Sequence, residues 1–439
     1  MSSFWCGQAV IGGAVARSVR IEESNGSITA VVSGAVRRDG DLTLPGLVLP
    51  GLANGHSHAF HRALRGRTHA DGGTFWTWRE EMYRVANALD PESYLELATA
   101  VFAEMVLGGY TLVGEFHYLH HRPDGSRYEN ATAMEDAVVA AASAAGIRLT
   151  LLDTLYLAGG AGLPLEPAQR RFSDDTVARW AQRRDAVRFG PLARGGAAIH
   201  SVRAVPPELF AAIRDVTRGL PLHAHVSEQR AENEDARSAF GATPTAVFAD
   251  AGLLGPSFTA VHGTHLSDAD IQLLGSSRST VCFCPTTERD LADGIGPAGA
   301  LVNSGARLSL GSDQNAVIDP FEEIRGLEMD ERLATGERGR FTPVQLLTAA
   351  SAHGYASLGW DGGRIEVGTV CDLVAVDLGS PRTAGVAADQ AWLAATSGDV
   401  TTVVVGGVVR VSEGRHGLGD VGALLGTAIE RASMGRLNP

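Results

Sequence analysis

Histidines and one aspartate stand at the ends of several apolar segments along the chain. They are His56 and His58, which form a His-x-His pair, and His200, His225, His262 and Asp313. A single histidine at the end of a strand is usually a hydrogen-bonded core residue, and a His-x-His pair alone says little. Several independent strand ends with the same chemistry instead predict one shared site. Imidazole together with carboxylate suits zinc in a hydrolytic centre that keeps one position open.

The segments that carry these residues alternate between strand and helix signals. Eight buried-strand candidates are Leu47–Leu49, Leu112–Phe116, Leu149–Asp153, Ala197–His200, Leu220–His223, Phe258–His262, Thr280–Phe283 and Leu308–Gly311. Helix starts are marked by Asp90-Pro91, Asp319-Pro320 and Thr342-Pro343, where a residue able to cap the helix precedes a proline. This alternation predicts a (β/α)8 barrel of the TIM type, whose active site lies at the carboxyl ends of the strands.

Both ends of the chain read as short strands separated by turns. Asn25-Gly26 marks such a turn near the start, and Asp372–Asp377 and Thr402–Val405 are strand candidates near the end. We expect residues 1–46 and 361–439 to form a small β-sandwich domain, and residues 47–360 to form the catalytic barrel.

Composition excludes several kinds of function. The formal net charge of −13 argues against a nucleic-acid partner, because such binding depends on basic contacts to phosphate. All basic residues are arginine, so a lysine Schiff base and a carbamylated lysine bridging two metals are both excluded. No apolar run approaches the ~20 residues that span a bilayer, and no signal peptide is evident. We expect a cytoplasmic enzyme without a membrane partner.

The residues at the strand ends resemble a known family. His56-x-His58 after Leu49-Pro50-Gly51, His225-x-x-Glu228, His262 and Ser312-Asp313 resemble the mononuclear deaminase branch of the amidohydrolase superfamily. The resemblance covers nearly the whole chain and includes Gly363–Leu373, where Cys371 replaces the usual alanine. Within that branch, Phe75–Glu80, Glu115–His121 and His200–Arg203 look like the formimidoylglutamate deiminases.

The resemblance implies a role for each matching residue. It implies that His56, His58, His225 and Asp313 bind one Zn²⁺ per chain, that Glu228 shuttles a proton, and that His262 polarises water or substrate. From the chemistry of such a site, Asp313 is also the residue that accepts the proton of the attacking water. Arg203, His200 and Tyr118 match substrate-binding positions of the family.

Two departures from the family pattern lie near the expected pocket. His61 stands where the family often has glutamine, and we expect it to hydrogen-bond the substrate. Asp313-Gln314-Asn315 replaces a more usual Asp-Ser-His. Arg79 is a further candidate, because a dicarboxylate substrate needs a second cation, although a solvated surface arginine explains Arg79 equally well.

The implied reaction is the hydrolytic deamination of N-formimidoyl-L-glutamate to N-formyl-L-glutamate and ammonia, a step of histidine degradation. The substrate would be a small anion derived from an amino acid, and we expect a homodimer. One alternative is a deaminase of a neutral amino-purine or a guanidino compound with the same zinc chemistry. Another is a catalytically inactive scaffold of the same fold. Arg203, Tyr118 and His200 favour the first reading, because a ring substrate needs no carboxylate clamp.

Other polar and aromatic residues have simpler interpretations. We expect His223 to lie on the face of its strand opposite to His225, and Trp76 to be a buried aromatic. His117, His120 and His121 look like a second metal cluster, but the ligand set above does not require one. Arg170-Arg171 and Arg183-Arg184 are interpreted as solvated helix faces.

Overall fold

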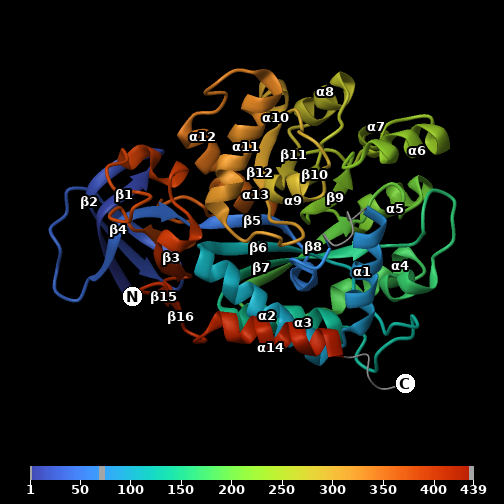
Figure 1. Ribbon diagram of the computed structural model, residues 1–439, viewed down its shortest axis with the longest axis horizontal. Helices are drawn as coiled ribbons and strands as arrows, with labels where there is room; N and C mark the ends of the chain where they lie inside the picture. The colour runs from blue at the N-terminus through green and yellow to red at the C-terminus, as the bar shows by residue number, and fades with distance from the viewer. Residues whose placement is uncertain (1, 69–74, 435–439) are drawn as a thin grey trace.

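The computed structural model describes residues 2–68 and 75–434, and it places the middle of the chain in a parallel β-barrel (Figure 1). The strands are β5 (Leu52–Ser57), β6 (Tyr110–His117), β7 (Arg148–Leu155), β8 (Ala193–Ile199), β9 (Leu222–Val226), β10 (Phe258–His262), β11 (Thr280–Phe283) and β12 (Arg307–Leu310). Neighbouring strands pair in sequence order. A single parallel bridge between Ser57 and Asp313 joins the two ends of this sheet, so the barrel is nearly closed. The predicted (β/α)8 architecture is confirmed.

Helices cover the outside of the barrel. They are α2 (Pro91–Gly108), α3 (Ala133–Ala145), α4 (Val177–Ala186), α5 (Phe210–Val216), α6 (Arg230–Phe240), α7 (Pro244–Asp250), α8 (Asp268–Ser276), α9 (Pro285–Asp290), α10 (Ala298–Ser304), α11 (Pro320–Thr335), α12 (Pro343–Thr348) and α13 (Gly354–Ser357). The three predicted starts are confirmed: Asp90, Asp319 and Thr342 each accept a bond from a backbone amide of the first turn. In the described residues, no helix is long and apolar enough to span a bilayer.

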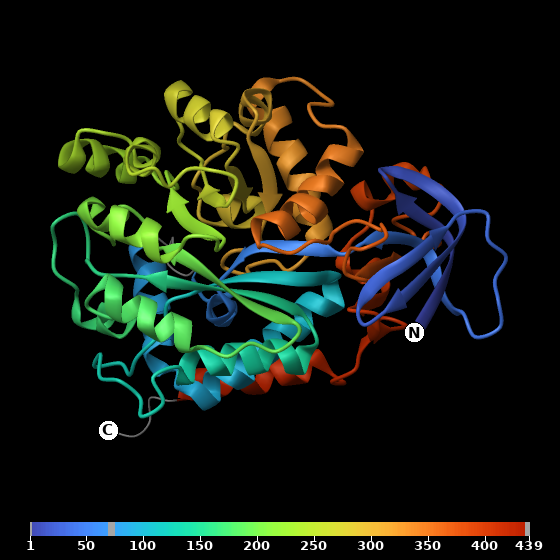
Figure 2. The ribbon, with the colours of Figure 1, turned by 180° about the vertical axis from the view of Figure 1, so that it is seen from behind.

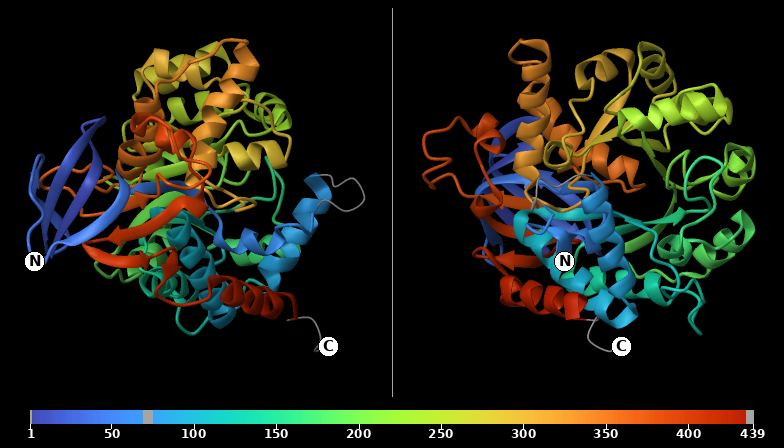
Figure 3. Two further views of the ribbon diagram at one scale, coloured as in Figure 1. Left: turned by 60° about the vertical axis from the view of Figure 1, so that its left-hand side comes forward. Right: turned by 45° about the vertical axis from the view of Figure 1, so that its right-hand side comes forward.

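The strands of the two chain ends form a separate sheet beside the barrel (Figure 3). They are β1 (Ser2–Ile11), β2 (Ala14–Ser24), β3 (Ser27–Val32), β4 (Leu42–Pro50), β13 (Leu373–Val376), β14 (Val400–Val405), β15 (Val408–Ser412) and β16 (Arg415–His416). Hydrogen bonds connect all eight into one sheet, in the order β16-β15-β14-β13-β4-β1-β2-β3. β4 lies at its centre, parallel to β1 and antiparallel to β13.

One strand prediction is wrong as a result. Leu47–Leu49 does not open the barrel, because it belongs to β4, and the barrel begins with β5. Val48 packs into the core of the end-strand sheet, whereas Leu47 and Leu49 pack into the main core. A strand buried on both faces reads as a continuous apolar run, which is also the pattern of a barrel strand. The expected boundary between residues 46 and 47 therefore falls inside β4.

Two helices lie outside the regular alternation. α14 (Val421–Met434) follows the last strand of the end sheet and packs against α2, along the side of the barrel (Figure 2). The expected end domain therefore includes a helix that belongs to the outer layer of the barrel. α1 (Phe75–Ala88) precedes α2 and contributes residues to the pocket described next.

Candidate active site

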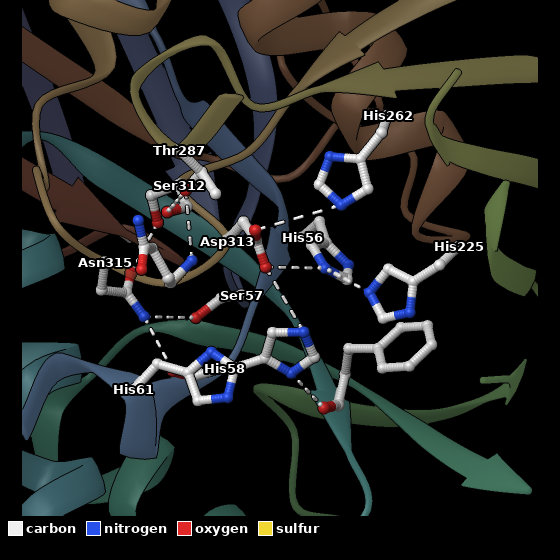
Figure 4. A network of polar contacts seen from close by, with 12 residues as sticks. His56, Ser57, His58, His61, His225, His262, Thr287, Ser312, Asp313 and Asn315 are labelled. Carbon is white, nitrogen blue, oxygen red and sulfur yellow. Dashed lines mark hydrogen bonds and ion pairs between the residues drawn. The ribbon is translucent and has the colours of Figure 1, made fainter. Parts of the chain in front are cut away.

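Four side chains from distant parts of the sequence meet at the carboxyl ends of the barrel strands (Figure 4). His56 and His58 lie at the end of β5, His225 lies in β9, and Asp313 follows β12. The Nε2 atoms of His56 and His225 are 3.2 Å apart. Oδ1 of Asp313 lies 3.2 Å from Nε2 of His56 and 3.4 Å from Nε2 of His58. Three imidazole nitrogens and a carboxylate oxygen that converge in this way are a donor set that fits zinc.

The other ring nitrogen of two of these histidines fixes the ring orientation. Nδ1 of His58 donates to the carbonyl of Phe116 at 2.9 Å, and Nδ1 of His225 donates to the carbonyl of His200 at 2.9 Å. The lone pairs of their Nε2 atoms are therefore left facing the shared point, as in histidines that bind metals. Burial lowers the pKa of His56, His58 and His225, so all three are neutral at pH 7, the form that binds a metal.

Three residues at these strand ends adopt the left-handed backbone conformation that favours glycine. Their φ angles are 53° at Ser227, 69° at His262 and 42° at Asp313. Such a conformation costs of order 1–3 kcal/mol and persists only where surrounding contacts hold it. After Ser227, the amide of Glu228 donates to a carboxylate oxygen of Glu232 at 3.1 Å. The strained backbone thus occurs at His262 and Asp313, which belong to the site, and at Ser227, next to Glu228.

Polar side chains hold the segment that carries Asp313. Nδ2 of Asn54 donates to Oγ of Ser312 at 2.6 Å, and this hydroxyl donates to Oδ1 of Asn315 at 2.6 Å. Nδ2 of Asn315 donates to the carbonyl of His58 at 3.0 Å. Asn315, one of the departures from the family pattern, therefore joins the first strand of the barrel to the segment after the last.

His262 lies beside the four-residue cluster, with carboxylates on several sides. Its Nε2 is 3.9 Å from Oε1 of Glu228 and 4.0 Å from Oδ2 of Asp313, and its Nδ1 is 3.4 Å from Oε1 of Glu288. Burial alone would lower the pKa of His262, but the charge of Glu228, the hydrogen bond to Glu288 and the charge of Asp313 raise it well above its usual value. His262 is therefore an imidazolium at neutral pH.

Glu288 is a site residue that the sequence did not reveal. It lies in the first turn of α9, where its Oε1 accepts a hydrogen bond from the amide of Cys284 at 2.8 Å and faces His262. No site residue is predicted at the end of β11, the strand before this helix. A carboxylate in the first helical turn after a barrel strand was the signal that could have found it.

A pocket beside the cluster brings together the five residues predicted to bind substrate. They are His61, Arg79, Tyr118, His200 and Arg203. Nε2 of His61 lies 3.1 Å from the hydroxyl of Tyr118. Nε of Arg203 is buried and has no hydrogen-bond partner among the residues that the structure describes. Arg79 donates to the hydroxyl of Tyr83 at 2.9 Å. The pocket thus presents guanidinium groups next to a donor set that fits a metal.

Aromatic side chains form much of the pocket wall. Trp78, Tyr83, Tyr118, Tyr156 and Phe172 line it. Nε1 of Trp78 donates to Oε1 of Gln314 at 2.9 Å, so the second departure from the family pattern holds an aromatic wall residue. Gln169 donates to the hydroxyls of Tyr83 and Tyr156 at 2.9 Å and 3.0 Å. The side chain of Trp76 lies outside the described residues.

A second group of histidines is buried behind the pocket. Nε2 of His117 and Nδ1 of His120 lie 3.1 Å and 2.8 Å from Oε1 of Glu135. Nη1 of Arg183 donates to the same oxygen at 2.7 Å. Because a guanidinium already neutralises this carboxylate, the geometry favours a polar network here over a second metal. His223 lies outside both groups, as predicted, and its Nε2 hydrogen-bonds to the carbonyl of Ser357.

Three arginines interpreted as solvated are buried. Arg171 donates to the carbonyls of Ala86 and Leu89 near the end of α1. Arg183 forms ion pairs with Glu135, Asp153 and Asp174. Arg184 lies over the ring of Trp180 and donates to the carbonyl of Val216. That interpretation is wrong. A run of arginines looks the same in the sequence whether its side chains contact water or carboxylates of other elements. Arg170 is exposed, as predicted.

Comparison with known proteins agrees with this site. The sequence profile of the Amidohydrolase family matches residues 47–410, which is most of the chain. The chain belongs to the amidohydrolase family. A formimidoylglutamate deiminase from Pseudomonas aeruginosa is 36% identical over 95% of the chain and 96% of the relative. Because of this family membership and this similarity, the protein is a hydrolase that acts on C–N bonds.

Other proteins, among them deaminases named for other substrates, are also similar. A 5-methylthioadenosine/S-adenosylhomocysteine deaminase from Natronomonas pharaonis is 29% identical over 92% of the chain and 91% of the relative. A crystal structure of an amidohydrolase from Brucella melitensis superimposes with a TM-score of 0.90 and 31% identity, covering 99% of this chain and 100% of that one. An adenosine deaminase from Xanthomonas campestris with bound zinc gives a TM-score of 0.85 and 26% identity, covering 99% and 98%.

Proposed function

We propose that this amidohydrolase is a zinc-dependent deiminase that converts N-formimidoyl-L-glutamate and water to N-formyl-L-glutamate and ammonia. The observation that carries the proposal is Arg203, whose buried Nε has no partner among the described residues and which lines the same pocket as Glu228 and Asp313. A guanidinium with a shielded and unpaired Nε–H favours an acceptor such as a carboxylate, because an unsatisfied buried donor is costly. A substrate carboxylate would supply it. The 36% identity to a formimidoylglutamate deiminase supports the same substrate.

The metal would be a single zinc ion held by His56, His58, His225 and Asp313. Neutral imidazoles and one carboxylate are ligands that zinc favours, and their atoms already converge on one point. A zinc ion bound there would supply Lewis acidity, which lowers the pKa of water to about 7. A zinc-bound adenosine deaminase with the same fold supports this choice of metal.

Proton transfer would depend on two carboxylates. Burial would raise the pKa of Asp313, but its contact with Nε2 of His56 and the charge of His262 lower it well below its usual value, so Asp313 is an anion that can accept a proton from attacking water. Glu228 lines the pocket and its side chain is 17% exposed, which leaves it able to reach the substrate nitrogen. His262, as an imidazolium, would orient the attacking water or the substrate between these carboxylates.

The reaction balances with these groups alone and one water molecule. The water oxygen adds to the formimidoyl carbon as Asp313 takes its proton. Glu228 then takes the proton of the new hydroxyl group and passes it to the nitrogen of the protonated formimidoyl group. The C–N bond breaks as the C=O bond forms, and the proton held by Asp313 leaves with ammonia as ammonium. Arg203 and Arg79 would bind the two carboxylates, with Tyr118, His200 and His61 as further polar contacts. Remote binding of this kind positions the reacting carbon, which is where such contacts raise kcat.

A purine deaminase is the second candidate, since a specific observation favours it. Five aromatic side chains line the pocket, and relatives at 29% identity are named as deaminases of 5-methylthioadenosine and S-adenosylhomocysteine. A neutral ring without an acceptor, however, would leave the shielded Nε of Arg203 unpaired. The carboxylate substrate therefore fits the pocket better.

Ammonia release from a panel of substrates tests the proposal. The panel consists of N-formimidoyl-L-glutamate, N-formimidoyl-L-aspartate, a guanidino amino acid and 5-methylthioadenosine, each with the zinc-loaded protein. We expect kcat/KM to be highest for N-formimidoyl-L-glutamate. Turnover of 5-methylthioadenosine without turnover of formimidoylglutamate would contradict the proposal and favour the purine deaminase.

A further inference from the structure

A second cavity lies at the opposite end of the barrel from the candidate active site. Its lining includes Arg148 at the start of β7, Ala193 at the start of β8 and residues of α3. The turns at Gly26 and Gly406 of the end-strand sheet complete it. The cavity therefore lies between the barrel and that sheet. Gly406 has a φ of 60°, and a Cβ there would lie 3.3 Å from Nη2 of Arg148, so the glycine keeps the turn clear of this guanidinium.

Two arginines line this cavity, a third lies against one of its lining residues, and one of the three has a carboxylate partner. Arg148 lines the cavity and donates to the two carboxylate oxygens of Asp372 at 2.6 Å and 3.1 Å. Arg410 also lines it, from β15. Arg194 lies over the ring of Trp360, a lining residue, at 4.0 Å from the centroid. Neither Arg194 nor Arg410 forms an ion pair with any residue between 2 and 68 or between 75 and 434.

Arg410 is held in place without a hydrogen bond to its Nε. That atom is shielded from solvent and has no partner among the described residues. Its side chain lies against Gly146 at the end of α3, where a Cβ would come within 2.6 Å of Cδ and Nε. The carbonyl of Ala145 at this helix end already accepts from Nε2 of His416, so Arg410 does not cap it. Burial, and then the charge of Arg148, lower the pKa of Arg410 and of Arg194.

This excess of positive charge contrasts with the rest of the molecule. The chain carries a formal net charge of −13, and the buried Arg183, by comparison, is paired with three carboxylates. Of these three arginines, only Arg148 pairs with a carboxylate, Asp372, among the described residues. Glu23 is another acid at the lining turn, where it accepts from the amide of Gly26. Two positive charges are thus left uncompensated beside a cavity, where an anion would relieve their mutual repulsion.

We propose that this cavity binds a small tetrahedral dianion of the phosphate class, with Arg410 as its principal contact. The free Nε and the planar guanidinium of Arg410 suit phosphate oxygens, and two uncompensated charges match a dianion. Arg148 and Arg194 contribute the surrounding positive field. The site lies at the amino ends of the strands, far from the pocket at their carboxyl ends, and it does not depend on the proposed deiminase activity.

Calorimetric titration with inorganic phosphate tests this site in the full-length protein at low ionic strength. Two variants should remove it: Arg410→Gln, which deletes the contact, and Ser143→Glu, which adds a carboxylate at an exposed lining position on α3. Arg218→Gln, at an exposed arginine outside the cavity, is the matched control. Arg203→Met removes one cation of the candidate active site and so tests whether phosphate binds there.

We expect one phosphate per chain in the wild type, in Arg218→Gln and in Arg203→Met, and a Kd weakened about tenfold or more in Arg410→Gln and Ser143→Glu. Phosphate binding that is absent, or that does not change in Arg410→Gln, would overturn the proposal. Titration with succinate separates the ligand classes. Binding of succinate but not phosphate through Arg410 would overturn the assignment to a phosphate-class dianion.

Discussion

At the scale of single residues, the groups that would bind the metal differ in part from the groups that would move protons. Glu228 lies three residues beyond His225, yet it is not part of the four-residue donor set. Its Oε1 lies 3.9 Å from Nε2 of His262. Removing its charge should therefore leave the metal in place and affect the chemical step alone.

Glu228→Gln should retain zinc and lower kcat by about a hundredfold or more, because the leaving nitrogen loses its proton donor. Elemental analysis and ammonia release measure the two effects on the same sample. Glu234→Gln, at an exposed position on α6, the helix that follows Glu228, is the control and should match the wild type. Normal turnover by Glu228→Gln would assign the proton transfer to another residue.

Zinc content tests the donor set itself. We expect about one zinc per chain in the wild type, as a single four-residue site requires. His225→Ala should lose both zinc and activity. His223→Gln changes the histidine two positions earlier, which points away from the site, and it should keep zinc even if the protein is less stable. Two tightly bound metals in the wild type would contradict the single-site assignment.

At the scale of elements, the ends of the barrel strands were predictable and the networks between elements were not. His56, His200, His225, His262 and Asp313 could be placed together because the carboxyl ends of parallel strands share one face of a barrel. Glu288 reaches His262 from the first turn of α9, and the rule that gathers strand ends at one face of a barrel does not say which helix residues reach that face. The assignment of Leu47–Leu49 failed because apolarity does not tell which of two sheets a buried strand joins.

The buried network around Arg183 shows the same limit and supports its own test. Arg183 joins α4 to Glu135 of α3 and Asp153 of β7, and its side chain is 4% exposed. Arg183→Met should lower the free energy of unfolding by about 3–5 kcal/mol, because the change leaves buried carboxylates without a counter-charge. Urea unfolding measures this loss. Arg179→Met, on the exposed face of the same helix, should stay near wild type, and equal losses in both variants would argue against the network.

At the scale of the whole molecule, stability should depend on a buried acid beneath the metal site. Glu115 of β6 is fully buried, its Oε1 accepts from the amide of Ala59 at 2.7 Å, and its Oε2 has no described partner. Burial raises the pKa of Glu115 from 4.5 to about 8. Between these values the folded protein holds a proton that the unfolded chain has lost. Raising the pH across this window therefore destabilises the fold.

Glu115→Gln removes this titration and keeps an oxygen acceptor. The stability of Glu115→Gln relative to wild type should therefore rise from about pH 5 to pH 8, by at most about 1.4 kcal/mol for each pH unit, and level off beyond. Urea unfolding at several pH values measures it. Glu129→Gln, at an exposed carboxylate, is the control. A constant difference between Glu115→Gln and wild type would show that Glu115 is ionised in the folded state.

The most direct test of the proposed reaction is the specificity of Arg203→Met. Wild type and variant are compared with N-formimidoyl-L-glutamate and with an N-alkylformamidine that has no carboxylate, and Arg218→Met serves as the control. Loss of a charged hydrogen-bonding contact in a closed pocket costs a few kcal/mol. We therefore expect kcat/KM for formimidoylglutamate to fall about a hundredfold, with little change for the uncharged formamidine and unchanged zinc content. An equal loss on both substrates, or no loss on either, would contradict a carboxylate clamp at Arg203.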